Sequence, residues 1–274
     1  MASNRDWNAT RFPAWFEHNV PKRYPLPRKN DEDLLQMVED IEEVRDLMTL
    51  RSYYQAQGQR QKELDELWVS QPLHAAKASY GANWGYYYGK SEVQRWYVDQ
   101  YTQKKKAQLK TWSEKNGVPY DEKNLGAGCM AMFPLSTSIV RIAADGNSAK
   151  GIWYSIGQQT ELLPDGTAQG QWQYNKICAD FIKEDGKFKI YHIVVANDQN
   201  YAAGTNYSAD TYIDPKDDIM ATEFGTPTIP MNVHDNTYNW ADNYPPMPEP
   251  YDTLTPETSY GPEGHPMLKG GRKA

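Results

Sequence analysis

The chain has 274 residues, a formal net charge of −7 and only two cysteines, Cys129 and Cys178. Twelve acidic but only four basic residues follow residue 197, so no basic surface indicates a nucleic-acid partner, and two cysteines give no disulfide framework. No apolar run is long enough for a membrane span or a signal peptide, and we therefore expect a cytoplasmic protein without a membrane partner.

The first 29 residues combine aromatic side chains with four prolines. We interpret residues 1–29 as an extended arm that docks its aromatic side chains on another surface. Its aromatic residues are Trp7, Phe12, Trp15, Phe16 and Tyr24.

A helix is predicted to begin after Asn30, which is a suitable N-cap, and to stop near Gly58. Apolar residues recur through it at helical spacing, opposite an acidic face. A second, shorter helix is predicted over residues 61–68. Residues 80–89 then form a glycine-spaced aromatic segment, and Ser91 with Gln94 opens a helix that ends near Gly117.

Three Asp-Gly pairs, which begin at Asp145, Asp165 and Asp185, follow one another at intervals of twenty residues. Asp-Gly favours type I′ hairpin turns. The runs around these turns are rich in β-branched and aromatic residues, which is typical of strands. They predict a four-stranded meander whose long strands are strongly curved or bulged. Its strands are expected at 133–143, 149–161, 168–183 and 187–196.

The composition changes after residue 196, because ten of the eighteen prolines fall in residues 197–274. Such a segment forms no core of its own. We interpret it as an acidic, irregular strap with a disordered end, which packs over the domain or, as we expect, over a neighbouring subunit. The predicted organisation is therefore an arm (1–29), an α+β domain (30–196) and a strap (197–274).

Three phrases, at 83–89, 144–153 and 180–192, resemble the SnoaL-like branch of the nuclear-transport-factor-2-like superfamily. The resemblance covers about residues 31–196. It implies a cone-shaped α+β barrel, in which a curved, mainly antiparallel sheet wraps around N-terminal helices and encloses an apolar pocket. Members are usually dimers or trimers, so we expect a homo-oligomer. They include dehydratases, a dehydrochlorinase, cyclases, an isomerase and a lyase that removes formaldehyde from lignin-derived diarylpropanes.

The dehydratases of this superfamily use an Asp–His dyad that this sequence lacks. The Asp position falls at about Gln57, and the His position at about Met132 or Phe133. Either the chemistry differs or the protein is not an enzyme.

His192, Lys176, Asp180 and Tyr80 are the candidate catalytic residues. Histidine ordinarily titrates near neutrality, so His192 in a pocket would suit a general acid or base, and the alternative is a buried structural histidine. Lys176 and Asp180 are four residues apart on one strand, so they share a face. Inside the cone they would form an acid–base couple, whereas on the outer face they would form a plain salt bridge. Tyr80 is a candidate hydrogen-bond donor.

The candidate substrate-binding residues are mostly aromatic, as expected for an aromatic ligand, although such residues also fill ordinary cores. They are Tyr53, Tyr54, Gln57, Asn83, Trp84, Tyr87, Phe133, Trp153 and Trp172. The remaining histidines are scattered singly, the cysteines suit a core, and no phosphate loop or dinucleotide motif is present, so we expect no metal and no cofactor.

These features predict a cofactor-independent lyase, of dehydratase or formaldehyde-releasing type, with a hydrophobic aromatic substrate such as a diarylpropane. The first alternative is a non-catalytic binding or assembly subunit of the same fold. The second is an isomerase or cyclase for a polycyclic substrate.

Overall fold

The structure is a computed structural model that describes residues 30–206, 225–231 and 245–265. The predictions for the arm at 1–29, for tail residues 207–224 and 232–244, and for the disordered end at 266–274 lie outside the described residues.

The first two predicted helices are confirmed. Helix α2 (Asp31–Ala56) begins at the predicted N-cap, where the Asn30 side chain accepts a hydrogen bond of 2.7 Å from the backbone N–H of Asp33. The short helices α3 (Arg60–Glu66) and α4 (Pro72–Ala75) follow.

The glycine-spaced aromatic segment forms a hairpin of β1 (Ser79–Ala82) and β2 (Gly85–Tyr88). The predicted third helix is confirmed in position but is divided into three parts. These are α5 (Lys90–Val93), the π-helical turn η2 (Gln94–Gln100) and α6 (Tyr101–Asn116). It ends at Gly117, whose φ of 65° is the left-handed conformation of a glycine C-cap.

The predicted meander is confirmed, with bulges or irregularities in β4, β6 and β7. The described strands and short 3₁₀ turns after α6 are β3 (Ala131–Met132), β4 (Ser136–Ile142), β5 (Ser148–Leu162), β6 (Ala168–Glu184), β7 (Lys187–Ala202), β8 (Ile229–Pro230), η5 (Pro256–Thr258) and η6 (Pro262–Gly264).

The three Asp-Gly turns are not alike. Only Asp185-Gly186 has positive φ at both residues, 51° and 77°, as a two-residue type I′ turn requires. The type I′ prediction is wrong for Asp145 and Asp165, where only the glycine has positive φ. Both turns are longer, and the aspartate side chain accepts a hydrogen bond from the backbone N–H two residues later, at 2.9 Å in each case.

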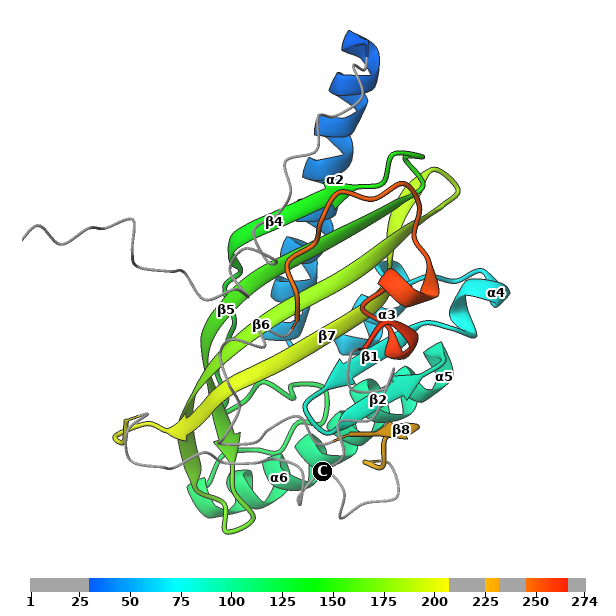
Figure 1. Ribbon diagram of the computed structural model, residues 1–274. Coiled ribbons are helices and arrows are strands. Elements are labelled where there is room, and N and C mark those ends of the chain that lie inside the picture. The colour runs from blue at the N-terminus through cyan, green and yellow to red at the C-terminus, as the bar shows by residue number, and fades with distance from the viewer. Residues whose placement is uncertain (1–29, 207–224, 232–244, 266–274) are drawn as a thin grey trace, which may run out of the picture.

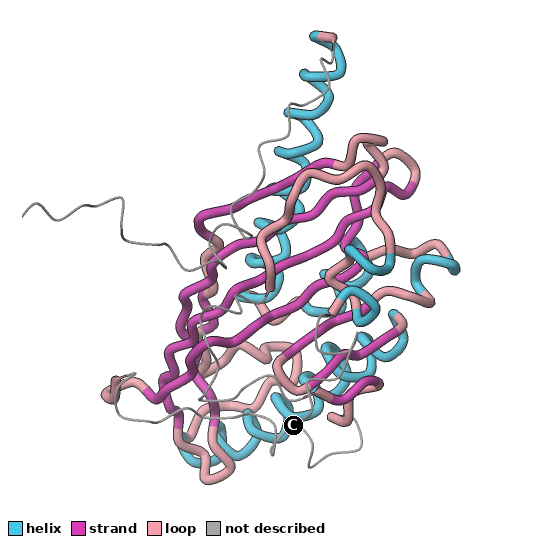
Figure 2. Tube along the Cα trace, viewed as in Figure 1, coloured by secondary structure: helices cyan, strands magenta, loops and turns pink. Residues whose placement is uncertain are grey.

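The described strands form one eight-stranded sheet in the order β3-β5-β6-β7-β1-β2-β8, with β4 also paired to β5. All pairs are antiparallel except β1 with β7, so the sheet is mixed but mainly antiparallel. Figures 1 and 2 show it curving past the helices without closing. The predicted α+β class and curved sheet are confirmed.

Both faces of the sheet are covered. The inner face packs on α2, α3 and η2 around a large core that includes Met48, Trp68 and Phe181. The outer face carries a smaller cluster in which Cys178 and Val194 contact Tyr260 of the strap. In the described part of the chain, no helix is long and apolar enough to cross a membrane.

Candidate functional site

A buried ion pair lies between the helices and the inner face of the sheet. Arg51 of α2 and Glu63 of α3 are 1% and 0% exposed, and Arg51 Nε lies 3.2 Å from Glu63 Oε1. Burial is the largest influence and acts to lower the pKa of Arg51, but the Glu63 carboxylate and the phenols of Tyr97 and Tyr80 together outweigh it, and the net pKa is raised. Arg51 is therefore charged, and its charge is balanced by a single buried carboxylate.

Two phenols adjoin this pair. Tyr97 donates a hydrogen bond of 2.6 Å to Glu63 Oε2, and the Tyr80 ring stacks on Tyr97 at 5.1 Å. Burial raises the pKa of both phenols, and for Tyr80 the nearby Arg51 opposes this effect in part. Both remain protonated at neutral pH, so each phenol carries a proton that it can donate.

A continuous aromatic wall leads away from these groups. The ring of Trp96 lies 4.8 Å from that of Tyr80, and Trp84 lies 6.0 Å from Trp96. Tyr87 stacks on Trp96 at 4.3 Å. Since Trp84 and Trp96 are only partly buried, the wall connects the charged interior with a more accessible part of the inner side.

Asn83, which follows β1, fixes this hairpin to the long strand β7. Its Nδ2 donates to the backbone carbonyl of Asn197 at 2.7 Å, and its Oδ1 accepts from the backbone N–H of Asn197 at 3.0 Å. These two bonds lie just beyond the last pair of the β1–β7 ladder, Ala82 with Val195. The amide of Asn83 thus has a structural role beside the aromatic wall.

A second polar group crosses the outer face of the sheet. Lys150, Asp180, His192 and Ser79 are successive partners on β5, β6, β7 and β1. Lys150 Nζ lies 3.7 Å from Asp180 Oδ1, and His192 Nδ1 lies 2.8 Å from Ser79 Oγ. Burial, and then the Lys150 ammonium, lower the pKa of His192 to about 3. Burial raises the pKa of Asp180 to about 6.

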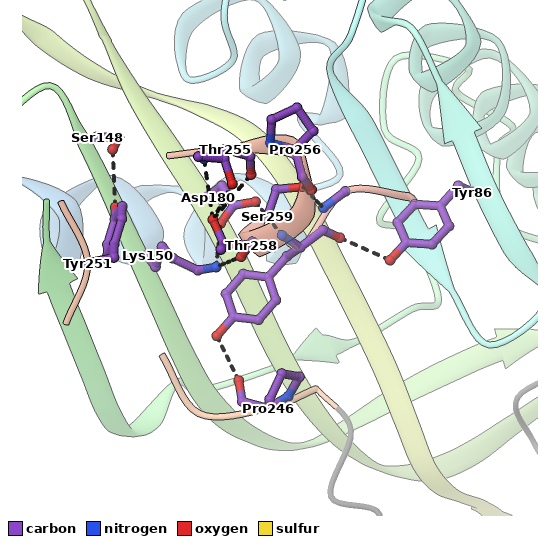
Figure 3. Close-up of polar contacts among 12 residues, drawn as sticks. Tyr86, Ser148, Lys150, Asp180, Pro246, Tyr251, Thr255, Pro256, Thr258 and Ser259 are labelled. Carbon is purple, nitrogen blue, oxygen red and sulfur yellow. Dashed lines mark hydrogen bonds and ion pairs between the residues drawn. The ribbon is translucent and has the colours of Figure 1, made fainter. Parts of the chain in front are cut away.

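The strap segment 245–265 packs against Lys150 and Asp180 (Figure 3), and its Gly261 lies against the ring of His192. The backbone N–H of Tyr260 donates to Asp180 Oδ2 at 2.6 Å, Lys150 donates to the carbonyl of Thr258, and Tyr86 donates to the carbonyl of Tyr260 at 2.9 Å. A cavity of about 350 Å³ lies between Lys150 and the strap. The described strap contacts its own domain, and its docking on a neighbouring subunit stays a prediction.

The prediction that Lys176 and Asp180 form a couple inside the cone is wrong. Both lie on the outer face, where Asp180 pairs with Lys150 and Lys176 with Asp198 at 3.4 Å. His192 is also on the outer face, 3% exposed, so it does not face the helices. Strand alternation correctly placed residues 176 and 180 on one face. It did not identify which face, because helices cover one side and the strap covers the other.

The other predicted residues fall into three groups. Tyr53 is 63% exposed and Gln57 caps the exposed end of α2, so neither faces the inner core. Tyr54 packs at the edge of that core and donates to Glu66 at 2.7 Å. Phe133, Trp153 and Trp172 lie on or near the sheet. Phe133 and Trp153 are buried, and Trp172 is half-buried.

Sequence reasoning missed the charged centre of the inner side and the cation of the outer row. Arg51 continues the buried stripe of Val44, Leu47 and Met48 on α2. A charged residue at a core position was the available signal for it. Lys150 had no comparable signal, because the strap that buries it lies about a hundred residues later in the chain.

Among the described residues, no group of three or more His, Cys, Asp or Glu side chains is placed to hold a metal ion.

No family model and no curated protein matches this chain. Solved structures that it resembles include an NTF2-like protein with a cystatin-like fold from Novosphingobium aromaticivorans, at 14% identity over 68% of this chain and 96% of that one (TM-score 0.39). A second is a type 2 hexachlorocyclohexane dehydrochlorinase LinA, at 11% identity over 63% of this chain and 95% of that one (TM-score 0.43). A third is the type 3 LinA enzyme from Novosphingobium barchaimii, at 11% identity over 63% of this chain and 97% of that one (TM-score 0.40). The names agree with the superfamily that the sequence resembles. At these scores and identities they support no conclusion about activity.

Proposed function

We propose that this chain is a cofactor-independent lyase that acts on a hydrophobic aromatic substrate at the inner side of the sheet. The observation that supports the proposal is the Arg51–Glu63 pair with Tyr80 and Tyr97, enclosed at the end of an aromatic wall. Buried charges with perturbed pKa values are costly, and they gather at functional sites.

The proposed reaction is an elimination. Glu63 is the carboxylate of the cluster and takes a proton from the substrate, while the protonated phenol of Tyr80 donates a proton to the departing oxygen. Loss of hydroxide and a proton gives an alkene and water, after which the proton returns from Glu63 to Tyr80. The Arg51 guanidinium stabilises the negative charge that develops next to Tyr80.

The aromatic wall supports an aromatic substrate, because Trp84 and Trp96, which meet edge to face with centroids 6.0 Å apart, are only partly buried and can pack against a further ring. Within this class we propose a diaryl compound such as a lignin-derived diarylpropane, from which a dehydratase releases water and an aldehyde-releasing lyase releases formaldehyde. The proposed oligomer is a homodimer or homotrimer.

The test is product analysis by mass spectrometry on phenolic and diaryl substrates, with Tyr80→Phe beside the wild type. The variant is expected to reduce kcat/KM by about 10²–10⁴-fold. Tyr120→Phe, at an exposed tyrosine remote from the cluster in the sequence, is the matched control and keeps full activity. Equal activity of both variants would contradict the role of Tyr80. A product with the mass of its substrate would indicate an isomerase or cyclase.

One observation favours a non-catalytic subunit instead. Trp68, Tyr80 and Tyr97 stack on each other, with ring centroids 6.5 and 5.1 Å apart, so that the chain's own rings occupy the inner side. A binding or assembly subunit with this core is expected to show no turnover of any substrate class and to co-purify with a partner protein. The same product analysis, together with mass measurement of the purified assembly, separates the two functions.

A further inference from the structure

The first turns of α2 project beyond the edge of the sheet (Figure 1). The buried residues of this helix begin only at Asp40. Before that point Leu34, Leu35 and Val38 are 40%, 61% and 54% exposed. Leu34, Val38 and the partly buried Ile41 follow the i, i+4, i+7 spacing of one helix face. These three residues with Leu35 are called the α2 apolar stripe below.

A stripe of this kind requires a cover, because three large apolar side chains in a row on a projecting helix are costly to leave in water. The charge around the stripe restricts what the cover is. Residues 31–46 contain eight acidic residues and one basic residue. Asp31, Glu32 and Asp33 form the first turn, and Glu39 lies one turn after Leu35, so acidic residues flank the stripe. A second copy of α2 laid on the stripe would bring like charges together, which is destabilising.

The segment that directly precedes α2 has the complementary composition. Residues 1–29 contain six basic but only two acidic residues, together with five aromatic residues. The stripe ends eleven residues after Asn30, or about 17 Å along the helix at 1.5 Å per residue. An extended chain spans about 3.3 Å per residue, so fewer than ten residues of the arm are needed to reach back along the stripe.

From this complementarity we infer that the basic, aromatic arm of residues 1–29 folds back on its own chain and packs on the α2 apolar stripe. The aromatic side chains of the arm cover Leu34, Leu35 and Val38, and its basic residues face the acidic groups that flank them. The arm is thereby an intramolecular partner of α2, independent of the chemistry proposed for the inner side of the sheet.

The test uses the full chain with the photoreactive amino acid p-benzoylphenylalanine at position 35, in an equal mixture of ¹⁴N- and ¹⁵N-labelled protein. Irradiation followed by peptide mass spectrometry is expected to give cross-links from position 35 to residues 1–29. In each cross-linked pair both peptides should carry the same nitrogen isotope, because the cross-link forms within one chain. The matched control places the label at position 36, an exposed site of the same helix on the face opposite to Leu34 and Val38, and gives few such cross-links. Mixed-isotope cross-links would assign the stripe to a second copy. Cross-links to other regions, or equal yields at both positions, would also overturn the inference.

Hydrogen exchange provides a second measurement that does not depend on cross-linking. In the full chain, Trp15→Ser with Phe16→Ser is expected to raise the exchange rates of backbone amides in residues 34–41 by about tenfold, which corresponds to about 1.4 kcal/mol. Rates in β6 and β7 remain unchanged, which shows that the domain is folded. Unchanged rates in residues 34–41 would contradict the inference. Added salt weakens the attraction between arm and helix and moves the wild type toward the variant.

Discussion

Acidification should release the strap and destabilise the domain through His192. This histidine is buried under the strap, and its pKa falls from 6.5 to about 3, first because of burial and then because of the Lys150 ammonium. Its folded pKa is below its unfolded pKa. The stabilisation is therefore fully present above pH 6.5 and is lost as the pH falls toward 3.

The size of the effect follows from these two pKa values. One unit of difference in pKa between folded and unfolded states corresponds to about 1.4 kcal/mol, so His192 alone accounts for about 4–5 kcal/mol between pH 6.5 and pH 3. His265, whose pKa burial lowers to about 4, acts in the same direction. Asp180 acts in the opposite direction, because its pKa is raised from 3.8 to about 6. Its contribution to the free energy of unfolding is largest below pH 3.8 and is lost as the pH rises through 6.

His192→Gln isolates the histidine, because the amide still offers a hydrogen-bond partner to Ser79 but does not titrate. Urea unfolding of both proteins, followed by circular dichroism from pH 7.5 to pH 4, gives the free energy of unfolding at each pH. The wild type should lose about 3 kcal/mol more than the variant over the interval from pH 6.5 to pH 4. His265 and Asp180 are present in both proteins and cancel in this difference. Parallel profiles would refute the reasoning.

Three further changes test the packing on both faces. Glu63→Gln leaves Arg51 charged and buried without its partner, so urea unfolding should show that the free energy of unfolding falls by about 3–5 kcal/mol. Adding Arg51→Met to that variant should recover part of this loss, and no recovery would argue against a charge effect. Gly261→Ala places a Cβ atom 2.9 Å from ring atoms of His192, so limited proteolysis should cut the strap faster, and equal cleavage rates would mean that the strap adapts. Asn83→Ala removes both bonds to β7 and should cost about 1–3 kcal/mol by thermal unfolding, a prediction that an unchanged melting temperature contradicts.

The local features of the fold could be predicted because their causes are local. The Asn30 cap, the glycine stop at Gly117 and the two-residue turn at Asp185-Gly186 each depend on the backbone preferences of a few adjacent residues. The same reasoning was wrong for the turn type at Asp145 and Asp165. Loop length decides that type, and loop length depends on where the flanking strands stop pairing.

Which residues of the sheet point toward the helices could not be predicted from the strands alone. Period-two alternation separates two sets of residues, but it identifies the buried set only when the other set faces water. Here Cys178 and Val194 on the outer face are as buried as Ile177 and Ile193 on the inner face. Backbone groups of Thr258 and Tyr260 in the strap bond the polar residues of the outer face, and backbone groups carry no sequence pattern.

The two polar clusters are connected through strand β1. Ser79 points to the outer face and bonds His192, while the next residue, Tyr80, points to the inner face and lies beside Arg51. The Ser79–His192 bond and the β1–β7 ladder therefore fix the strand that carries the Tyr80 phenol. Because the strap seals His192 with Gly261, loosening of the strap should also affect the position of Tyr80. A strap variant that slows turnover without touching the inner side would be explained by this connection.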